Sequence, residues 1–191
     1  SGAVRAQEAA PPTWNLCVSP NTIPLFTDLI TAPVERQSAA TDVSANTLDV
    51  KSGEVTVFSG DVKLVHADQW MSTDKVTYSH ESEQFVTEGQ VRYQDRAIRL
   101  TAEAASGDQK ADTLKMEKVH YQFNEELGNG NAATAVMKGP IGSLTRATYS
   151  TCPPGQRQWE FSAGRISVND ETATGVAHNV SLRLGGVPVL W

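Results

Sequence analysis

Length, composition and charge exclude several classes of function. The chain has 191 residues, with 22 acidic and 16 basic side chains and a formal charge of −6. Nucleic-acid binding needs a basic surface, and docking on an anionic lipid surface needs clustered lysine and arginine, so this balance argues against both. A chain of this length can bury a substantial core. No stretch of the sequence is long and apolar enough to predict a transmembrane helix.

Residues 1–41 are expected to form an extended N-terminal arm. The apolar stretch Asn21–Val34 is punctuated by Pro20, Pro24 and Pro33. Because proline removes a backbone donor and fixes φ, a long helix is not expected here.

The two cysteines, Cys17 in the arm and Cys152, lie far apart in the sequence. Their spacing is not that of a metal site. Composition leaves three possibilities open: two free thiols, one long-range disulfide within the chain, or disulfides to cysteines outside it. Pro153, Pro154 and Gly155 directly follow Cys152 and predict an accessible turn.

From about residue 42 onward the hydrophobic pattern has a period of two. Short runs of apolar residues alternate with polar neighbours, which is typical of strands with one buried and one wet face. Gly-, Ser- and Asp-rich turns separate the runs. The clearest runs are Leu48/Val50, Val55/Val57, Val62/Leu64, Val76/Tyr78, Val91/Tyr93, Ile98/Leu100, Leu114/Met116, Val119/Tyr121/Phe123, Ile166/Val168 and Val180/Leu182/Leu184. Residues 42–191 are therefore predicted to be an all-β domain.

The strand pattern also repeats. Val62, Val91 and Val119 are separated by about 29 residues, and Val180 lies close to two further steps along the chain. One such unit cannot bury its apolar face alone, so neighbouring units must stack. We therefore expect a twisted β-jellyroll or solenoid of antiparallel strands, with a generic β-sandwich as the alternative. Its apolar interior is either filled by side chains or splayed into a groove.

Candidate catalytic residues are few. His66, His80, His120 and His178 have neither the spacing nor the flanking cysteines of a metal site. The sequence contains neither a Gly-x-Ser-x-Gly elbow nor a phosphate-binding loop. The acidic residues fall at turns and on polar strand faces, where they protect edges. We therefore predict no enzyme activity, no metal and no cofactor; a carbohydrate-active β-sandwich enzyme would need two carboxylates that face one cleft.

Two features go beyond a generic β pattern. The sequence pattern of residues 47–68 resembles the OstA-type repeat of the periplasmic lipopolysaccharide-transport proteins: Thr47-Leu-Asp-Val … Gly60-Asp-Val-Lys-Leu … Ala67-Asp68. The run Ala147-Thr-Tyr-Ser-Thr-Cys-Pro-Pro-Gly155, followed by Trp159, resembles a segment of the LptD family of outer-membrane lipopolysaccharide-assembly proteins. The tail Gly186-Val-Pro-Val-Leu190 is similar to the stretch that leads into the barrel of that family, and Trp14-Asn-Leu-Cys17 matches its first cysteine.

The resemblance implies a β-jellyroll on the periplasmic side of the outer membrane. It would receive lipopolysaccharide from the bridge protein LptA and pass the acyl chains to a C-terminal barrel of the same polypeptide and its plug lipoprotein LptE. Cys17 and Cys152 would each form a disulfide with a cysteine near the end of that barrel. LptA would add to an edge formed by Val43, Ala45, Leu48 and Val50. The alternative function is a structural adaptor that binds other envelope proteins and has a filled core.

The alternation and the resemblance together predict which residues line the path of the acyl chains. The predicted lining is Val55, Val57, Val62, Leu64, Val76, Tyr78, Val91, Tyr93, Ile98, Leu100, Met116, Tyr121, Phe123, Phe161, Ile166, Val180 and Leu182. A register slip of one residue would exchange the two faces of a strand.

Overall fold

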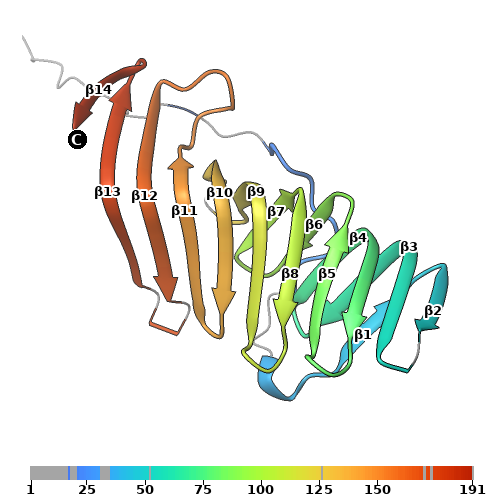
Figure 1. Cartoon of the computed structure of the whole chain (residues 1–191). Helices are drawn as coiled ribbons and strands as arrows, with labels where there is room; N and C mark the ends of the chain where they lie inside the picture. Colours follow the sequence, from blue (N-terminus) through green and yellow to red (C-terminus); the bar gives the residue numbers. More distant parts are fainter. Residues whose placement is uncertain are drawn as a thin grey trace, which may run out of the picture.

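A single antiparallel sheet dominates the chain. The computed structural model describes residues 17, 21–30, 35–51, 53–125, 127–169, 171–172 and 174–190. Within these residues the structure has one 14-stranded sheet and one 3-10 turn, η1 (Arg36–Ser38) (Figure 1). The strands are β1 (Thr41–Ser44), β2 (Thr47–Lys51), β3 (Val55–His66), β4 (Gln69–Ser79), β5 (Gln84–Glu88), β6 (Val91–Gln94), β7 (Ile98–Ala102), β8 (Ala104–Asp108), β9 (Thr113–Phe123), β10 (Asn129–Lys138), β11 (Ile141–Tyr149), β12 (Trp159–Asn169), β13 (Thr174–Leu184) and β14 (Val187–Leu190).

The sheet is creased across its middle. Asp61, Lys118, Arg146 and Asn179 have positive φ angles in the middle of long strands, and the pairing register skips or shifts at each of them. A residue in this left-handed region bends a strand sharply, and at Asp61 the bend includes a β-bulge, with one extra residue in β3. These positions lie in β3, β9, β11 and β13, and the pairing gaps at them align across the strands between β9 and β13, so the bends form one line across the sheet.

The crease divides the sheet into two half-sheets. β4 pairs with β6 on one side of the crease and with β5 on the other, and β9 likewise pairs with β7 and with β8. Half-sheet A consists of β1, β6, β7, β14 and residues 62–66, 69–73, 119–123, 129–132, 147–149, 159–163 and 180–184. Half-sheet B consists of β2, β5, β8 and residues 55–59, 75–79, 113–117, 134–138, 141–145, 165–169 and 174–178.

The crease explains the sequence repeat. Val62, Val91 and Val119 each follow the bend of a strand and are fully buried on the inner face. They lie in β3, β6 and β9, so one repeat unit of about 29 residues runs from half-sheet A into half-sheet B and back. Ala147 in β11 continues the series, and Val180 in β13 occupies the same position after the next bend. The fold is thus the all-β jellyroll that the sequence predicts.

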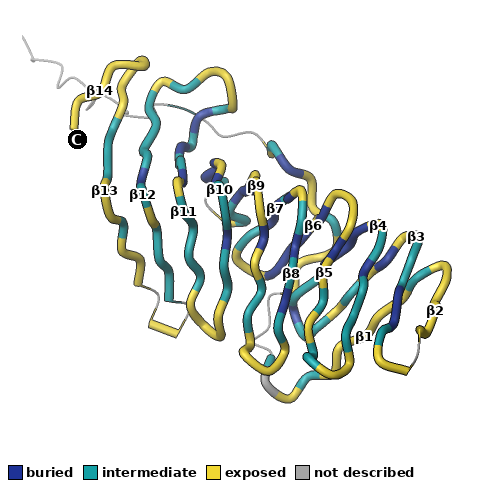
Figure 2. The backbone as a smooth tube through the Cα atoms, in the orientation of Figure 1, coloured by how far each residue is buried: buried dark blue, intermediate teal, exposed yellow. Residues whose placement is uncertain are grey.

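The two half-sheets enclose the core between their inner faces. Directly paired residues of an antiparallel sheet point to the same face, so the register assigns each side chain to the inside or the outside. The buried core draws on both halves, with Tyr93 and Leu100 from half-sheet A and Ala105 and Met116 from half-sheet B. Burial is deepest from β4 to β10 and decreases toward β13 and β14 (Figure 2).

Candidate functional site

The centre of the interior is filled by side chains. Tyr93, Leu100, Met116 and Tyr121 are all buried and belong to one cluster that links β6, β7 and β9. Their packing leaves this part of the jellyroll as an ordinary protein core. The interior is therefore not an open channel along its whole length.

The interior opens into an apolar groove between β9 and β13. The groove has a cavity volume of about 220 Å³ and receives side chains from both half-sheets. No carboxylate lies among its described lining residues, so the cleft needed by a glycoside-hydrolysing pair is not found there. The lining residues are Tyr121, Phe123, Leu144, Tyr149, Phe161, Ile166, Val168, Gly175, Val176 and Ala177.

The shape of the groove follows from the sizes of its side chains. On half-sheet A, aromatic rings follow one another from Phe123 to Tyr149 to Trp159, with ring centroids 6.1 and 5.8 Å apart. On half-sheet B, the last strand presents only Gly175 and Ala177 to the interior. Because Gly175 and Ala177 are small, the β13 end of half-sheet B leaves space opposite the rings that the core lacks.

Apolar residues also face inward at both ends of the sheet. At the N-terminal end Val43 pairs with Leu64, and Leu48 pairs with Phe58, yet Val43, Leu48 and Val50 are exposed. β1 and β2 pair only with β3, so both are edge strands.

The C-terminal end mirrors this arrangement. Leu184 pairs with Val187, Leu182 pairs with Leu190, and Leu184, Val187 and Leu190 are exposed. Both ends of the jellyroll therefore present apolar inner surfaces to solvent.

The register places almost all of the predicted lining residues on the inner face. Four of them line the groove itself, namely Tyr121, Phe123, Phe161 and Ile166. Val180 and Leu182 face inward in β13 beside it. The others pack in or around the core upstream of the groove: Val62, Leu64, Val76, Tyr78, Val91, Tyr93, Ile98, Leu100 and Met116.

Val55 and Val57 are exceptions. They pair with Ser79 and Thr77, whereas the inward Val76 pairs with Phe58. Both valines therefore point outward, contrary to the prediction from alternation. Thr56 and Phe58 take the inward positions, because β3 crosses the crease with one extra residue: its inward set steps by four residues, from Phe58 to Val62, whereas that of β9 steps by three, from Met116 to Val119.

Sequence reasoning missed six groove residues. Leu144, Tyr149, Val168, Gly175, Val176 and Ala177 were absent from the predicted lining. Two of them carry a signal in the sequence. Val168 alternates with Ile166 in one strand, and Leu144, which pairs with Ile166, lies at an apolar position of β11. Gly175 and Ala177 carry no hydrophobic signal, because their contribution is the absence of a large side chain.

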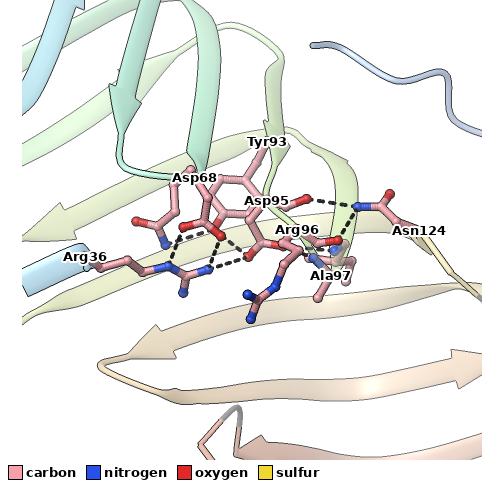
Figure 3. A network of polar contacts seen from close by, with 9 residues as sticks. Arg36, Asp68, Tyr93, Asp95, Arg96, Ala97 and Asn124 are labelled. Carbon is pink, nitrogen blue, oxygen red and sulfur yellow. Dashed lines mark hydrogen bonds and ion pairs between the residues drawn. The ribbon is translucent and has the colours of Figure 1, made fainter. Parts of the chain in front are cut away.

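A polar network lies beside the core, at the β3–β4 and β6–β7 turns (Figure 3). Arg36 of η1 donates to both carboxylate oxygens of Asp68, at 2.7 and 2.9 Å, and lies 3.6 Å from Asp95. The hydroxyl of Tyr93 donates to Asp95 at 3.0 Å and accepts a bond from Gln69. This network attaches the segment before β1 to the β3–β4 and β6–β7 turns.

Burial and charge act differently on the two carboxylates of this network. Burial raises the pKa of Asp95 above its ordinary value, although backbone N–H groups and Arg36 partly oppose it. Burial also acts to raise the pKa of Asp68, but the hydrogen bond and the charge of Arg36 outweigh it, so the pKa is lowered. Asp68 is thus the ionised partner of Arg36.

The histidines take part in ordinary strand contacts. His66 contacts Thr41, His80 contacts Thr56 and His120 contacts Asn131 through their side chains. Among the described residues no three His, Cys, Asp or Glu side chains are grouped to hold a metal ion. Within the same residues, no helix is long and apolar enough to cross a membrane.

Cys17 and Cys152 form a disulfide with each other in this structure, with Cα atoms 4.8 Å apart. Of the three possibilities left open by composition, the structure has the long-range bridge within the chain. Pairing with cysteines of a barrel stays a prediction for the longer polypeptide. The expected accessibility of Cys152 is wrong: the residue is 0% exposed, and its carbonyl accepts hydrogen bonds from the side chains of Asn129 and Arg157.

Comparisons with known proteins agree with this architecture. A family profile described as "LptA/(LptD N-terminal domain) LPS transport protein" matches residues 42–174. LPS-assembly protein LptD of Xanthomonas euvesicatoria pv. vesicatoria (strain 85-10) is 36% identical over 187 residues, which are 95% of this chain and 23% of that protein. LPS-assembly protein LptD of Xylella fastidiosa (strain 9a5c) is 34% identical over 188 residues, again 95% of this chain and 23% of that protein.

A solved structure is also similar in part. LptH, the LptA homologous periplasmic component of the lipopolysaccharide transport device of Pseudomonas aeruginosa, aligns with a TM-score of 0.42 and 12% identity over 76% of this chain and 85% of its own. This chain spans 23% of the length of the LptD relatives named above. The profile match and the identity over nearly the whole chain show that the chain belongs to the LptD family, as its LptA-like N-terminal domain.

Proposed function

We propose that this domain carries the acyl chains of lipopolysaccharide along its inner face. The observation that carries the proposal is the apolar groove, which is shared by the two half-sheets and lined by aromatic and aliphatic side chains. Burial of each acyl methylene in such a groove contributes about 0.8 kcal/mol. No covalent step is involved, so the domain acts by binding and handing on its cargo rather than as an enzyme.

We place the two ends of the path at the exposed inward residues of the two sheet ends. We propose that Val43, Ala45, Leu48 and Val50 form the edge that receives an LptA-type partner by strand addition. The groove end at β11–β14 then faces the remainder of the polypeptide, which includes the barrel, and its partner LptE. The domain boundaries in this proposal are an arm of residues 1–41 and a jellyroll of residues 42–191, on the periplasmic side of the outer membrane.

Site-specific photo-crosslinking in cells tests the cargo. A crosslinker at Leu144 or Phe161, which line the groove, should capture lipopolysaccharide. Thr145 and Ser162 are matched controls, because they are the next residues on the same strands, are similarly half-buried and point outward. Equal capture at all four positions, or capture only at the controls, would refute the proposal.

The alternative is a structural adaptor with a filled core, and the packed centre of the jellyroll favours it. Tyr93 and Met116, predicted from the sequence to contact acyl chains, are buried in that centre. Capture at Leu144 and Phe161 distinguishes the transport proposal from the adaptor. Capture at Tyr93 or Met116 as well would show that the core itself opens during transport.

The receiving edge needs a variant that alters only the free side of β2. Asn46 donates its N–H to Gly60 of β3, so by strand alternation the N–H of Leu48 also points into the sheet and that of Asp49 points to the free edge. Asp49→Pro should therefore weaken binding of LptA at least tenfold in a titration, while Asp49→Ala, which keeps the N–H, should not. Unchanged affinity of Asp49→Pro would remove this edge as the receiving site.

A further inference from the structure

Three polar side chains are buried on the outer face of half-sheet A. Gln94, Arg99 and Gln122 are 1%, 2% and 0% exposed, although they alternate with residues of the inner core and so point away from it. They lie side by side on β6, β7 and β9, since Arg99 pairs with both Gln94 and Gln122. An outward polar residue would ordinarily be solvated, so another part of the protein must cover these three.

The N-terminal arm is the cover, and it is bound largely through its main chain. The side-chain oxygen of Gln122 accepts the N–H groups of Thr22 and Ile23 at 2.9 and 3.2 Å. Arg99 donates to the carbonyl of Ile23 and to the side chain of Asn21. Bonds to peptide groups do not depend on the side chains of the bound segment, so these residues recognise the main chain of the arm.

Gln94 holds the next part of the arm in the same way. Its side-chain oxygen accepts the N–H of Phe26 at 2.8 Å and its amide donates to the carbonyl of Thr27 at 2.8 Å. The ring of Phe26 stacks on Trp70 with centroids 5.7 Å apart, and Ile23 is buried. Leu25, between these two anchors, is 53% exposed.

The same region of the sheet holds Cys152. Gln122 pairs across the sheet with Asn129, and the side-chain amide of Asn129 donates to the carbonyl of Cys152 at 3.2 Å. Arg157 donates both to that carbonyl and to the side-chain oxygen of Asn129. The binding surface for the arm and the support of Cys152 therefore form one connected network.

We propose that Gln94, Arg99 and Gln122 form a peptide clamp that docks the arm and thereby positions Cys17 for bonding to Cys152. The clamp acts before the disulfide exists and does not require it. Its occupant is the segment 21–27 of this chain. This inference is independent of the proposed transport of lipopolysaccharide.

The clamp shifts the equilibrium of thiol–disulfide exchange between glutathione and the pair Cys17 and Cys152. Glutathione disulfide accepts two electrons and two protons from the thiols of Cys17 and Cys152, which gives the protein disulfide and two molecules of glutathione. A docked arm raises the effective concentration of one thiol at the other, as any tether of suitable geometry does. Loss of docking must therefore lower that concentration.

Variants of the arm test the clamp without altering the sheet. In glutathione buffers, the double variant Ile23→Ala/Phe26→Ala should lower the effective concentration of the Cys17–Cys152 pair about tenfold or more, because both anchors lose their packing. Leu25→Ala is the matched control, with an exposed side chain on the same segment. An equal effective concentration for the parent chain, the double variant and the control would overturn the proposal.

A second measurement removes the disulfide altogether. In Cys17→Ser/Cys152→Ser, hydrogen exchange should still find the amides of Ile23 and Phe26 protected at least tenfold over an unstructured chain, since Gln122 and Gln94 accept them. Arg99→Met in the same background should reduce the protection of Ile23 more than that of Val136 in β10. Exchange of the arm at unstructured rates in the cysteine-free chain would show that the disulfide, not the clamp, holds the arm.

Discussion

Gly130 offers a strict test of the close approach between β10 and β11. A Cβ atom at Gly130 would collide with the main-chain carbonyl of Thr148 and with the hydroxyl of Tyr121. Tyr121 donates that hydroxyl to the same carbonyl at 2.7 Å. Gly130→Ala must therefore move a strand backbone and break this hydrogen bond.

The expected cost follows from those two effects. Overpacking typically costs about 1–3 kcal/mol, and loss of the hydrogen bond adds about 0.5–1.5 kcal/mol, so the free energy of unfolding should fall by about 2–4 kcal/mol. For a chain of this size the melting temperature should fall by about 5–15 °C. Circular dichroism during thermal and urea unfolding, with the disulfide kept intact, measures both quantities.

Gly142 is the matched control for this prediction. It is also a strand glycine on the inner face, paired with Val168, but nothing lies within 4 Å of an added Cβ. Gly142→Ala should leave stability unchanged or raise it by up to about 1 kcal/mol, because alanine loses less backbone freedom on folding. Equal stabilities of the two variants would refute the reasoning about the β10–β11 approach.

Two further predictions concern the polar network and the disulfide. Asp68→Asn should lower the free energy of unfolding by about 1–3 kcal/mol at pH 7, because Arg36 loses its ionised partner. Since the folded pKa of Asp68 is depressed, this stability is present above the carboxyl's unfolded pKa and is lost as pH falls through the folded pKa. In acid titrations of unfolding, the stabilities of the parent and the variant should therefore converge below about pH 4. A constant difference in stability down to about pH 2 would contradict this reasoning. The Cys17–Cys152 bridge closes a loop of sequence separation 135. Its reduction should lower the free energy of unfolding in urea by about 2–5 kcal/mol. An unchanged free energy of unfolding on reduction would show that the bridge does not constrain the unfolded chain.

The sequence predicts the strands well because their alternation is local information. Val91/Tyr93 and Ile98/Leu100 face inward as expected, since each pair sits in a short strand without a bulge. Val55 and Val57 do not, because the extra residue before Val62 puts Thr56 and Phe58 on the inner face in their place. A bulge is a property of two strands together, so the pattern of one strand cannot reveal it.

The groove is harder to predict than the strands. Its position depends on how far apart the half-sheets lie, which no single strand encodes. Residues 129–138 are rich in alanine and asparagine and give little alternation, although β10 runs through them. The choice among disulfide pairings is equally non-local, because it depends on where the clamp places the arm.

The strands cross the crease differently at the centre and at the C-terminal end of the jellyroll. Near the centre the crease falls between consecutive strands: Gly89 lies between β5 and β6, and Glu103 lies between β7 and β8. Separate strands can turn sharply, so the half-sheets fold onto each other and bury Leu100 and Met116 between them.

Toward the C-terminal end the strands cross the crease without a break. In β11 and β13 the bend rests on one left-handed residue each, Arg146 and Asn179, within a continuous hydrogen-bonded strand. The strands β9 to β13 follow one another in the sheet, and each runs unbroken across the crease (Figure 1). The apolar groove lies along this run of unbroken strands, and Phe161 of β12 and Leu144 of β11 line its two sides.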